Sequence, residues 1–414
     1  MKTVAKLILF LSISYLPNAQ EKTPKVLFVI VDGISADVIE KVATPNLDAI
    51  SAQGGYTRAY MGGKKGGYSE TPTISAVGYN SLLTGTWVNK HNVPDNDIAA
   101  PNYNYWTLFR FVEEHRPKLK TAIFSTWLDN RTKLIGEGLP ATGNINLDYH
   151  FDGFELDTIM FPNSEHRFLK IDEHVTNEAA RYIREESPDL SWVYLQHTDN
   201  MGHQYGDSEQ FYEAVQQMDD QMGRLWEAIR YRKENHKEDW QIFITTDHGR
   251  NSETGKGHGG QSDRERLIWM VTNAKGNQYF KVGNPSMVDI APTILRELHI
   301  SPKKEQVWEM DGVPLTGSIS IANANAVIQG DIINLTWDAY GKKGKLNIYV
   351  SVANTFSQGG TDAYVLEEKV NLTTGEAQID VADFPSNFYK IVLEGEYNTV
   401  NTWVVESPKK PLRY

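Results

Sequence analysis

Four short and almost entirely apolar runs are spaced along the first two thirds of the chain, between stretches of helical character. They are KVLFVIVD at 25–32, KTAIFS at 120–125, SWVYLQH at 191–197 and WQIFITTD at 240–247. Runs of this kind suit strands that are buried on both faces of a mainly parallel sheet. The alternation of strands and helices therefore predicts an α/β domain with right-handed crossovers and helices on both faces of the sheet.

The clearest helix follows Ser208, where apolar residues recur at alternating spacings of four and three. Its apolar positions are Phe211, Val215, Met218, Met222, Leu225 and Ile229. This spacing places them on one helical face, which we expect to pack on the sheet. A second helix is predicted at about 174–186, because Ser187-Pro188 then disfavours helical backbone.

The pattern of apolar residues in the sequence changes near residue 317. From 318 onward the helical period disappears, and short strand-like runs are separated by the turn-forming segments GKKG, SQGG, TTGE and PSN. Such strands predict a small antiparallel sandwich of immunoglobulin or fibronectin type III character, with Trp337 in its core and Tyr389 as a corner tyrosine. We therefore expect a catalytic domain at 20–317 and a β-sandwich accessory domain at 318–414.

The N-terminus has the layout of a cleaved secretory signal. Lys2 and Lys6 flank the start of an apolar run at 7–16, which is followed by Pro17 and the small residue Ala19. A run of about ten residues is short for a membrane span, which needs about 20. We expect residues 1–19 to be a signal peptide, no membrane span, and a mature protein that is secreted or periplasmic.

Two features of the composition exclude classes of chemistry. The chain has no cysteine, which removes disulfides, thiolate zinc sites and cysteine nucleophiles. Its net charge of −12 argues against a nucleic-acid duplex as the main partner, because binding to phosphate backbones needs a basic surface. Any metal site must be built from His, Asp, Glu and hydroxyl groups.

Potential metal ligands follow three of the four predicted strands. Because the carboxyl ends of such strands meet at one edge of the sheet, their side chains are expected to converge. The candidates are Asp32, Asp199, His203, Asp247, His248 and His258. Six ligands exceed the needs of one tetrahedral zinc and suit two cations that share a site.

A two-metal site that transfers phosphoryl groups needs a nucleophile close to its cations. The segment SETPTISAVGYNSLLTGTWVNKHNVPDN at 69–96 supplies several hydroxyl groups. Composition alone does not choose between Thr71, Thr73, Ser75 and Ser81.

The chain resembles the alkaline phosphatase superfamily and, within it, the nucleotide pyrophosphatase/phosphodiesterase branch. The motifs that carry the resemblance run in the expected order from about residue 26 to 260, and VDIAPTIL at 288–295 resembles the closing segment of the same fold. They are VIVDG, ATPNLDAISAQGG, PTISAVGYNSLLTG, KHNVPDN, DNMGHQYGD, TTDHG and GHGG.

The resemblance implies a role for each matching position. Ser75 would be the nucleophile, where diesterases of this type usually carry threonine, and Asn96 with a backbone N–H would donate to a phosphoryl oxygen. Attack by Ser75 would give a covalent phospho-enzyme, which water then hydrolyses. One zinc would bind Asp32, Ser75, Asp247 and His248, and the other would bind Asp199, His203 and His258.

The class of ester is open between a phosphodiester, which we favour, and a phosphomonoester. A monoesterase neutralises one more negative charge, for which Arg131 is a candidate. However, Asp129 stands where related monoesterases carry a lysine, unless Lys133 takes that role. A diesterase would instead hold its second ester group on aromatic surface, for which the candidates are Tyr79, Trp87, Trp106 and Trp127.

Two further alternatives are less favoured. Sulfatases share the fold, but Val77 and Tyr79 occupy the Pro and Arg positions of their nucleophile motif. A non-catalytic protein that binds glycan through the sandwich domain would not need the intact set of ligands. The sequence thus predicts a secreted two-zinc hydrolase of small phosphate esters, with possible glycan or surface contact through its C-terminal domain.

Overall fold

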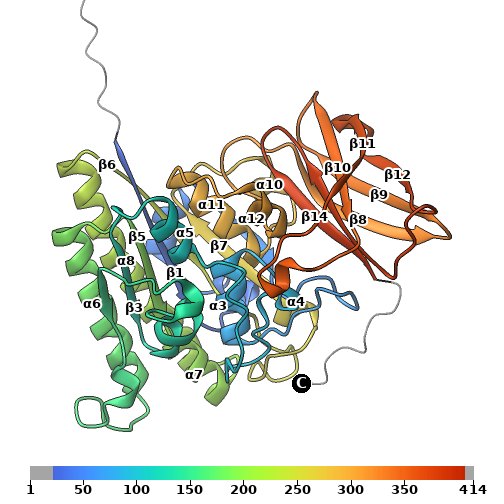
Figure 1. The fold of residues 1–414 in the computed structure, drawn as a ribbon. Coiled ribbons are helices and arrows are strands. Elements are labelled where there is room, and N and C mark those ends of the chain that lie inside the picture. Colours follow the sequence, from blue (N-terminus) through green and yellow to red (C-terminus); the bar gives the residue numbers. More distant parts are fainter. Residues whose placement is uncertain (1–21, 406–414) are drawn as a thin grey trace, which may run out of the picture.

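Seven strands form the central sheet of the first domain in a computed structural model that describes residues 22–405 (Figure 1). The four predicted strands lie side by side in the order β6-β1-β5-β3 and are parallel to one another. Their bounds are β1 (Thr23–Val31), β3 (Thr121–Ser125), β5 (Leu190–Leu195) and β6 (Glu238–Thr245). The predicted mainly parallel sheet is therefore confirmed, with each strand within about two residues of its expected start and end.

Three strands that we did not predict extend this sheet at both edges. On one side, β7 (Leu267–Thr272) pairs antiparallel with β6, and β2 (Gly55–Tyr60) pairs antiparallel with β7. On the other side, the short strand β4 (Tyr149–Phe151) pairs parallel with β3. The strand β1, which ends beside Asp32, consequently lies near the middle of the sheet.

Helices cover both faces of the sheet, as predicted. One core contains apolar side chains of α2 (Pro45–Ser51), α6 (Arg167–Glu186) and α8 (Glu209–Asn235). The other core contains side chains of α3 (Ser75–Thr84), α5 (Leu108–His115) and α11 (Ile290–Glu297). The remaining α-helices are α1 (Ala36–Ile39), α4 (Val88–His91), α7 (His197–Tyr205), α9 (Asp263–Arg266), α10 (Gln278–Val282) and α12 (Lys304–Glu309), and a π-helix, η1 (Asn130–Ile135), follows β3.

The C-terminal domain is a sandwich of two antiparallel sheets, ordered β11-β10-β13-β14 and β12-β9-β8. Trp337 is buried, and the hydroxyl of Tyr389 accepts a hydrogen bond from the Ser386 N–H (2.6 Å), as expected of a corner tyrosine. The first and last strands, β8 and β14, were not predicted. The strands are β8 (Ile321–Gln329), β9 (Ile332–Ala339), β10 (Lys345–Ser351), β11 (Val365–Asn371), β12 (Glu376–Asp380), β13 (Phe388–Glu394) and β14 (Thr399–Val405).

Two buried lysine side chains tie the two domains together. Lys390 on β13 contacts Glu309 at the end of α12 and Asp362, both at 2.5 Å. Lys90 on α4 contacts Asp311 at 2.5 Å, and both lysine side chains are fully buried. Because an unpaired buried charge is strongly destabilising, the Lys390–Glu309 pair fixes the sandwich against α12. Lys90 Nζ also donates to Asn401 Oδ1 on β14 at 3.2 Å, which links α4 to the sandwich.

The predicted signal peptide at 1–19 lies outside the described residues. Within 22–405, none of the helices combines the length and the apolar character that crossing a bilayer requires.

Candidate metal centre and nucleophile

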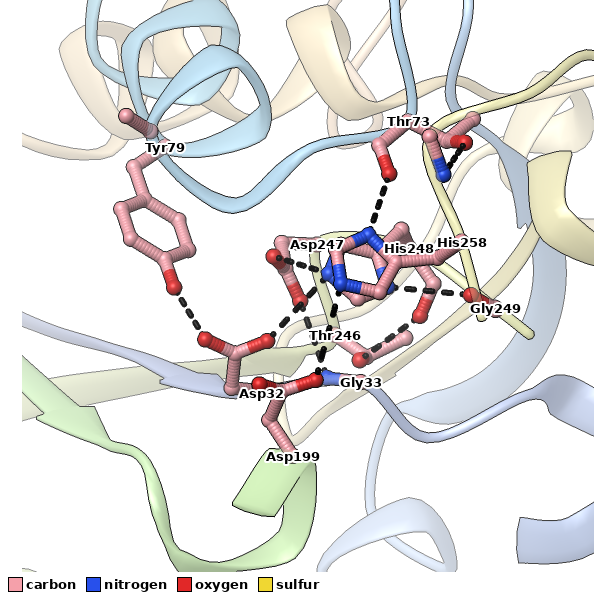
Figure 2. Close-up of polar contacts among 12 residues, drawn as sticks. Asp32, Gly33, Thr73, Tyr79, Asp199, Thr246, Asp247, His248, Gly249 and His258 are labelled. Atoms are coloured by element: carbon pink, nitrogen blue, oxygen red, sulfur yellow. Dashed lines mark hydrogen bonds and ion pairs between the residues drawn. The ribbon is translucent and has the colours of Figure 1, made fainter. Parts of the chain in front are cut away.

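One group of possible metal ligands lies at the carboxyl ends of the neighbouring strands β1 and β6. The His248 Nε2 atom lies 3.4 Å from Asp32 Oδ1 and 3.2 Å from Asp247 Oδ2, and all three side chains are buried (Figure 2). The parallel pairing of β1 with β6 brings these positions together from opposite ends of the domain sequence.

The atoms of this group that face one another have no hydrogen-bond partner. They are Asp32 Oδ1, Asp247 Oδ2 and His248 Nε2. Their partner atoms are engaged, because Asp247 Oδ1 accepts from the Gly33 N–H (3.0 Å) and His248 Nδ1 donates to the Gly249 carbonyl (3.0 Å). That tautomer leaves the lone pair of His248 Nε2 free. Buried orphan atoms of this kind fit a divalent cation.

A second group contains Asp199, His203 and His258. Asp199 and His203 lie one turn apart on α7, with His203 Nε2 3.4 Å from Asp199 Oδ2. His258 lies in the loop after β6, where its Nδ1 donates to the Thr73 carbonyl (2.9 Å). Its Nε2 consequently points toward His203 Nε2, at 3.1 Å.

The two groups adjoin one another. The rings of His248 and His258 are stacked, with centroids 3.7 Å apart and planes 12° apart. Figure 2 shows these rings one over the other, with Asp247 to their left and Asp199 below them. The structure thus brings all six predicted side chains together, in the two sets that the resemblance implied.

The carboxylates of the first group repel one another. Burial and then the charge of Asp199 raise the pKa of Asp32 to about 7. Burial and the charges of Asp32 and Asp199 raise the pKa of Asp247 well above its usual range. Like charges buried at this distance are destabilising unless a cation compensates them. A bound cation would therefore stabilise this group more than the group of Asp199, His203 and His258.

Asp199 differs because a buried cation compensates it. Its carboxylate accepts from Arg250 Nη2, and Arg250 also donates to the carbonyls of Gly33 and Asp199, both at 2.8 Å. Burial alone would raise the pKa of Asp199, but the hydrogen bond from His203 and the charge of Arg250 hold it below its usual value. Sequence reasoning missed Arg250, although it directly follows the Asp-His-Gly segment.

Ser75 is the first residue of α3, preceded by Ile74 as the N-cap. Ser75 is therefore the first helical residue of α3 and not its N-cap. Residues on both sides of Ser75 contact the donor groups. Thr73 contacts His258, whereas Tyr79 donates its hydroxyl to Asp32. The first turn of α3 consequently starts beside both groups (Figure 2).

The structure also separates Ser75 from the other hydroxyl groups. Thr71 Oγ1 donates to the Ser69 carbonyl, and Thr73 Oγ1 donates to the Gly260 carbonyl, each at 2.8 Å. Ser81 Oγ donates to the Val77 carbonyl at 2.7 Å. The hydroxyl of Ser75 makes no hydrogen bond with any of the residues at 22–405 and is thus free to react.

Asn96 lies against the same helix start. Its Oδ1 accepts from the Ala76 N–H at 2.9 Å, which orients the side chain and leaves the Nδ2 donors for another acceptor. The amide therefore lies beside Ser75, at the N-terminus of a helix, where the helix dipole favours an anion.

The two cations that we considered for a monoesterase pocket are both paired. Arg131 binds Asp152 at 2.6 Å and Glu137 at 2.6 Å, and these hydrogen bonds raise its pKa. Lys133 pairs with Asp129 at 2.9 Å. Two carboxylates already neutralise Arg131, so its guanidinium is not free for a phosphate.

The aromatic candidates occupy different positions. Tyr79 is fully buried and donates to Asp32, so it orients a candidate metal ligand and does not line an open pocket, which corrects our expectation. Trp87 is also buried and stacks on Tyr60. Trp106 is half-buried and lies under the guanidinium of Arg110, a residue of α5. Trp127, half-buried at the carboxyl end of β3 and in edge contact with Tyr79, remains the candidate closest to the site.

The mainly parallel sheet and its helices place this chain among proteins with an alkaline phosphatase-like fold. Within that class, it belongs to the type I phosphodiesterase/nucleotide pyrophosphatase family, whose model matches residues 26–293.

Named relatives are distant. The rat ectonucleotide pyrophosphatase/phosphodiesterase family member 7 (Rattus norvegicus) is 26% identical over 261 residues, which is 60% of this chain and 54% of the relative. A venom phosphodiesterase of Crotalus durissus collilineatus is 24% identical over 56% of this chain and 27% of its own. The chain spans about half the length of the first of these relatives and about a quarter of the second.

A solved structure agrees in fold. The phosphonate monoester hydrolase of Agrobacterium radiobacter superposes with a TM-score of 0.50 at 15% identity, covering 87% of this chain and 90% of the hydrolase. At this identity the likeness concerns the fold alone.

Proposed function

We propose that the protein is a phosphodiesterase that binds two zinc ions and uses Ser75 as its nucleophile. The observation that carries the proposal is the pair of adjoining Asp/His groups at the start of α3, in a chain of the phosphodiesterase family. Zinc suits ligand sets of imidazole and carboxylate without thiolate. Two sites in contact through His248 and His258 suit the spacing of about 4 Å that two-metal phosphoryl-transfer sites use.

When bound, the two cations would favour ionisation of the nucleophile and neutralise charge on the phosphoryl oxygens. Ser75 Oγ forms a bond to phosphorus while the bond to the leaving alcohol breaks on the opposite side. The serine proton passes to solvent water, and the departing alkoxide takes up a proton from solvent. Water then cleaves the Ser75–phosphoryl bond and restores the hydroxyl group.

Asn96 stabilises the transferring group. Its Nδ2 donates to a non-bridging phosphoryl oxygen, together with the free N–H groups at the start of α3. The hydrogen bond from Ala76 to Asn96 Oδ1 holds the amide in place before substrate binds, so little reorganisation is needed.

The pairing of Arg131 favours a diester over a monoester. A monoester carries a second negative charge, which this pocket would have to neutralise with a free cation. Arg131 is held by Asp152 and Glu137, and Asp129 adds a carboxylate at the neighbouring position. For a diester, Trp127 is the candidate surface for the second ester group.

Export of the protein, directed by a signal peptide at residues 1–19, stays a prediction.

A substitution at Ser75 tests the nucleophile. Ser75→Ala is expected to lower turnover of bis-p-nitrophenyl phosphate by at least about 10³-fold, with zinc content unchanged at about two per chain. Ser81→Ala removes a hydroxyl from the same helix and should keep turnover within about threefold. Unchanged turnover in Ser75→Ala would show that the nucleophile is another residue.

Three aryl esters rank the classes of substrate. Purified zinc-loaded protein should prefer bis-p-nitrophenyl phosphate over p-nitrophenyl phosphate and p-nitrophenyl sulfate. A preference for the monoester would contradict the diesterase proposal. In that case Arg131→Met, which removes the paired guanidinium, would test whether Arg131 contributes to the turnover of the monoester.

A further inference from the structure

A cavity of about 700 Å³ lies between the two domains and belongs to neither donor group. Its walls come from the loop at 63–69, from β7 and its preceding helix α9, and from β8 and β14 of the sandwich. None of the six Asp and His ligands, nor Ser75, lines it. A volume of this size at a domain interface is typical of small-ligand sites.

Three cations face this cavity without a carboxylate partner among the described residues. Lys64 donates to Asn325 Oδ1 at 2.7 Å, and Arg266 donates to the Gly63 carbonyl at 2.6 Å, so both are positioned without being neutralised. Lys65 is exposed beside them in the same loop. Three such cations at one opening are notable in a chain with a net charge of −12.

The carboxylates in the cavity wall do not cancel this charge. Asp311 is paired with Lys90. Asp289 accepts hydrogen bonds from two backbone N–H groups at 2.6 Å, and burial raises its pKa to about 7. Asp263 is thus the one lining carboxylate that is both exposed and free of an ion pair within 22–405. The opening is net positive and would attract an anion.

Aromatic faces complete the lining. Tyr68, which is 39% exposed, packs against Trp403 of β14 with ring centroids 5.4 Å apart. Tyr60 lies deeper, stacked on Trp87, with the Arg266 guanidinium over its ring. Flat apolar faces beside hydrogen-bonding groups suit a ring that is apolar on one face and polar at its edge.

We propose that this cavity binds an acidic saccharide. Pyranose rings would lie on Tyr68 and Trp403, and their carboxylate or sulfate groups would contact Lys64, Lys65 and Arg266. The site uses residues of both domains, which gives the sandwich a role beyond packing. It is separate from the proposed diesterase site and holds whether or not that activity is correct.

The loop that carries the lysines is suited to such contact. The Thr71 N–H donates to the Gly62 carbonyl at 3.0 Å, which closes residues 62–71 into a compact excursion. Gly63 and Gly66 adopt positive φ angles of 61° and 71°, which present Lys64 and Lys65 at its tip. The chain then runs directly to Ser75, so a saccharide held here would lie near the segment that precedes the nucleophile.

Calorimetric titration of the zinc-loaded full chain tests the proposal. The probes are a sulfated uronate-containing tetrasaccharide and a tetragalacturonate, with maltotetraose as the neutral comparison and inorganic sulfate as the ion alone. At least one acidic probe should bind, with affinity that falls as salt rises. Lys64→Ala/Lys65→Ala should weaken it by about tenfold or more, because charge-assisted contacts are lost.

The chain supplies its own matched control. The segment Gly-Lys-Lys-Gly occurs at 63–66 and again at 341–344 on the sandwich, away from the cavity. Lys342→Ala/Lys343→Ala changes the net charge equally and should leave saccharide binding intact. Tyr68→Ala should also weaken binding, whereas Tyr397→Ala, at another exposed tyrosine, should not. All four variants should hydrolyse a small aryl diester like the parent chain.

Three outcomes would overturn the proposal. The first is no binding of either acidic probe. The second is equal binding of maltotetraose or of inorganic sulfate, which would mean that charge or ring recognition is not required. The third is an equal loss in Lys342→Ala/Lys343→Ala, which would assign the effect to net charge alone. Loss of diesterase activity in Ser75→Ala leaves these results unaffected, so the two proposals fail separately.

Discussion

Arg250 and Asp199 form a buried ion pair beside the second donor group, reinforced by a hydrogen bond from Arg250 Nη2 to the Asp199 carbonyl at 2.8 Å. The guanidinium is enclosed so tightly that a Cβ atom on Gly202, one turn further along α7, would overlap it. Arg250 thereby fixes the start of α7, which carries Asp199 and His203. In the proposed metal site it would be a positioning residue, since it acts through Asp199.

The first prediction concerns this pair. Arg250→Met should lower the free energy of unfolding of the metal-free protein by about 3–5 kcal/mol, because it leaves the Asp199 charge buried without a partner. Chemical denaturation measures the effect. The control is Arg58→Met, which breaks a partly exposed pair with Glu40 and should cost less than about 1 kcal/mol. Equal losses in the two variants would contradict the assignment.

The sequence predicted the central strands and the convergence of the candidate ligands because local patterns carried them. The four central strands are apolar on both faces, and Asp32 and Asp247 directly follow two of them. Their convergence follows from parallel pairing alone. The edge strand β2 escaped prediction because its residues alternate in burial, and β4 has only three residues.

The sequence did not reveal which of the candidate side chains are buried or paired by tertiary contacts. Tyr79 lies four residues after Ser75, so both residues share one face of α3, but only the structure shows that this face turns inward to Asp32. From the sequence alone, Arg131 was considered a free cation, but in the structure it forms ion pairs with Asp152 and Glu137. Both differences arise from tertiary contacts between residues that no local pattern connects.

The second prediction concerns metal removal. Because Asp32 and Asp247 repel one another when buried without a cation, a chelator should lower the melting temperature of the parent protein. Asp247→Asn removes one charge and keeps the acceptor for the Gly33 N–H. At pH 8, metal-free Asp247→Asn should be about 1–3 kcal/mol more stable than the metal-free parent, and less stable than the zinc-loaded parent. A metal-free variant less stable than the metal-free parent would contradict this repulsion.

The third prediction concerns the pH dependence of stability at His91. Its Nδ1 accepts from the Val93 N–H and its Nε2 contacts Ser81 Oγ at 3.0 Å, an arrangement that requires the neutral ring. Burial lowers the pKa of His91 from 6.5 to about 3. The unfolded chain therefore binds the proton more readily than the folded one between these values. The stabilisation from neutral His91 is complete above pH 6.5 and falls by about 1.4 kcal/mol for each pH unit below it.

His91→Asn isolates this contribution, since its amide oxygen can replace Nδ1 as acceptor. The stability difference between the parent and His91→Asn should shrink by about 2 kcal/mol when the pH falls from 7.5 to 5. Denaturation at the two pH values measures it. His236→Asn, at an exposed histidine, should change by less than about 0.5 kcal/mol over the same interval. A constant difference for His91→Asn would mean that the folded state accepts the proton at His91.

The fourth prediction concerns the contact between the sandwich and the segment that carries Asn96. Asn102 and Asn104 both donate to the Ser357 carbonyl of the sandwich, at 2.9 and 3.1 Å. Asn102→Ala/Asn104→Ala should loosen this segment and lower kcat/KM for an aryl diester by about threefold to tenfold, with zinc content unchanged. Gln378→Ala removes a hydrogen bond to Asn334 within the other sheet, between β12 and β9, and should leave kcat/KM unchanged. If the double variant loses stability but keeps kcat/KM, the sandwich supports the fold without positioning Asn96.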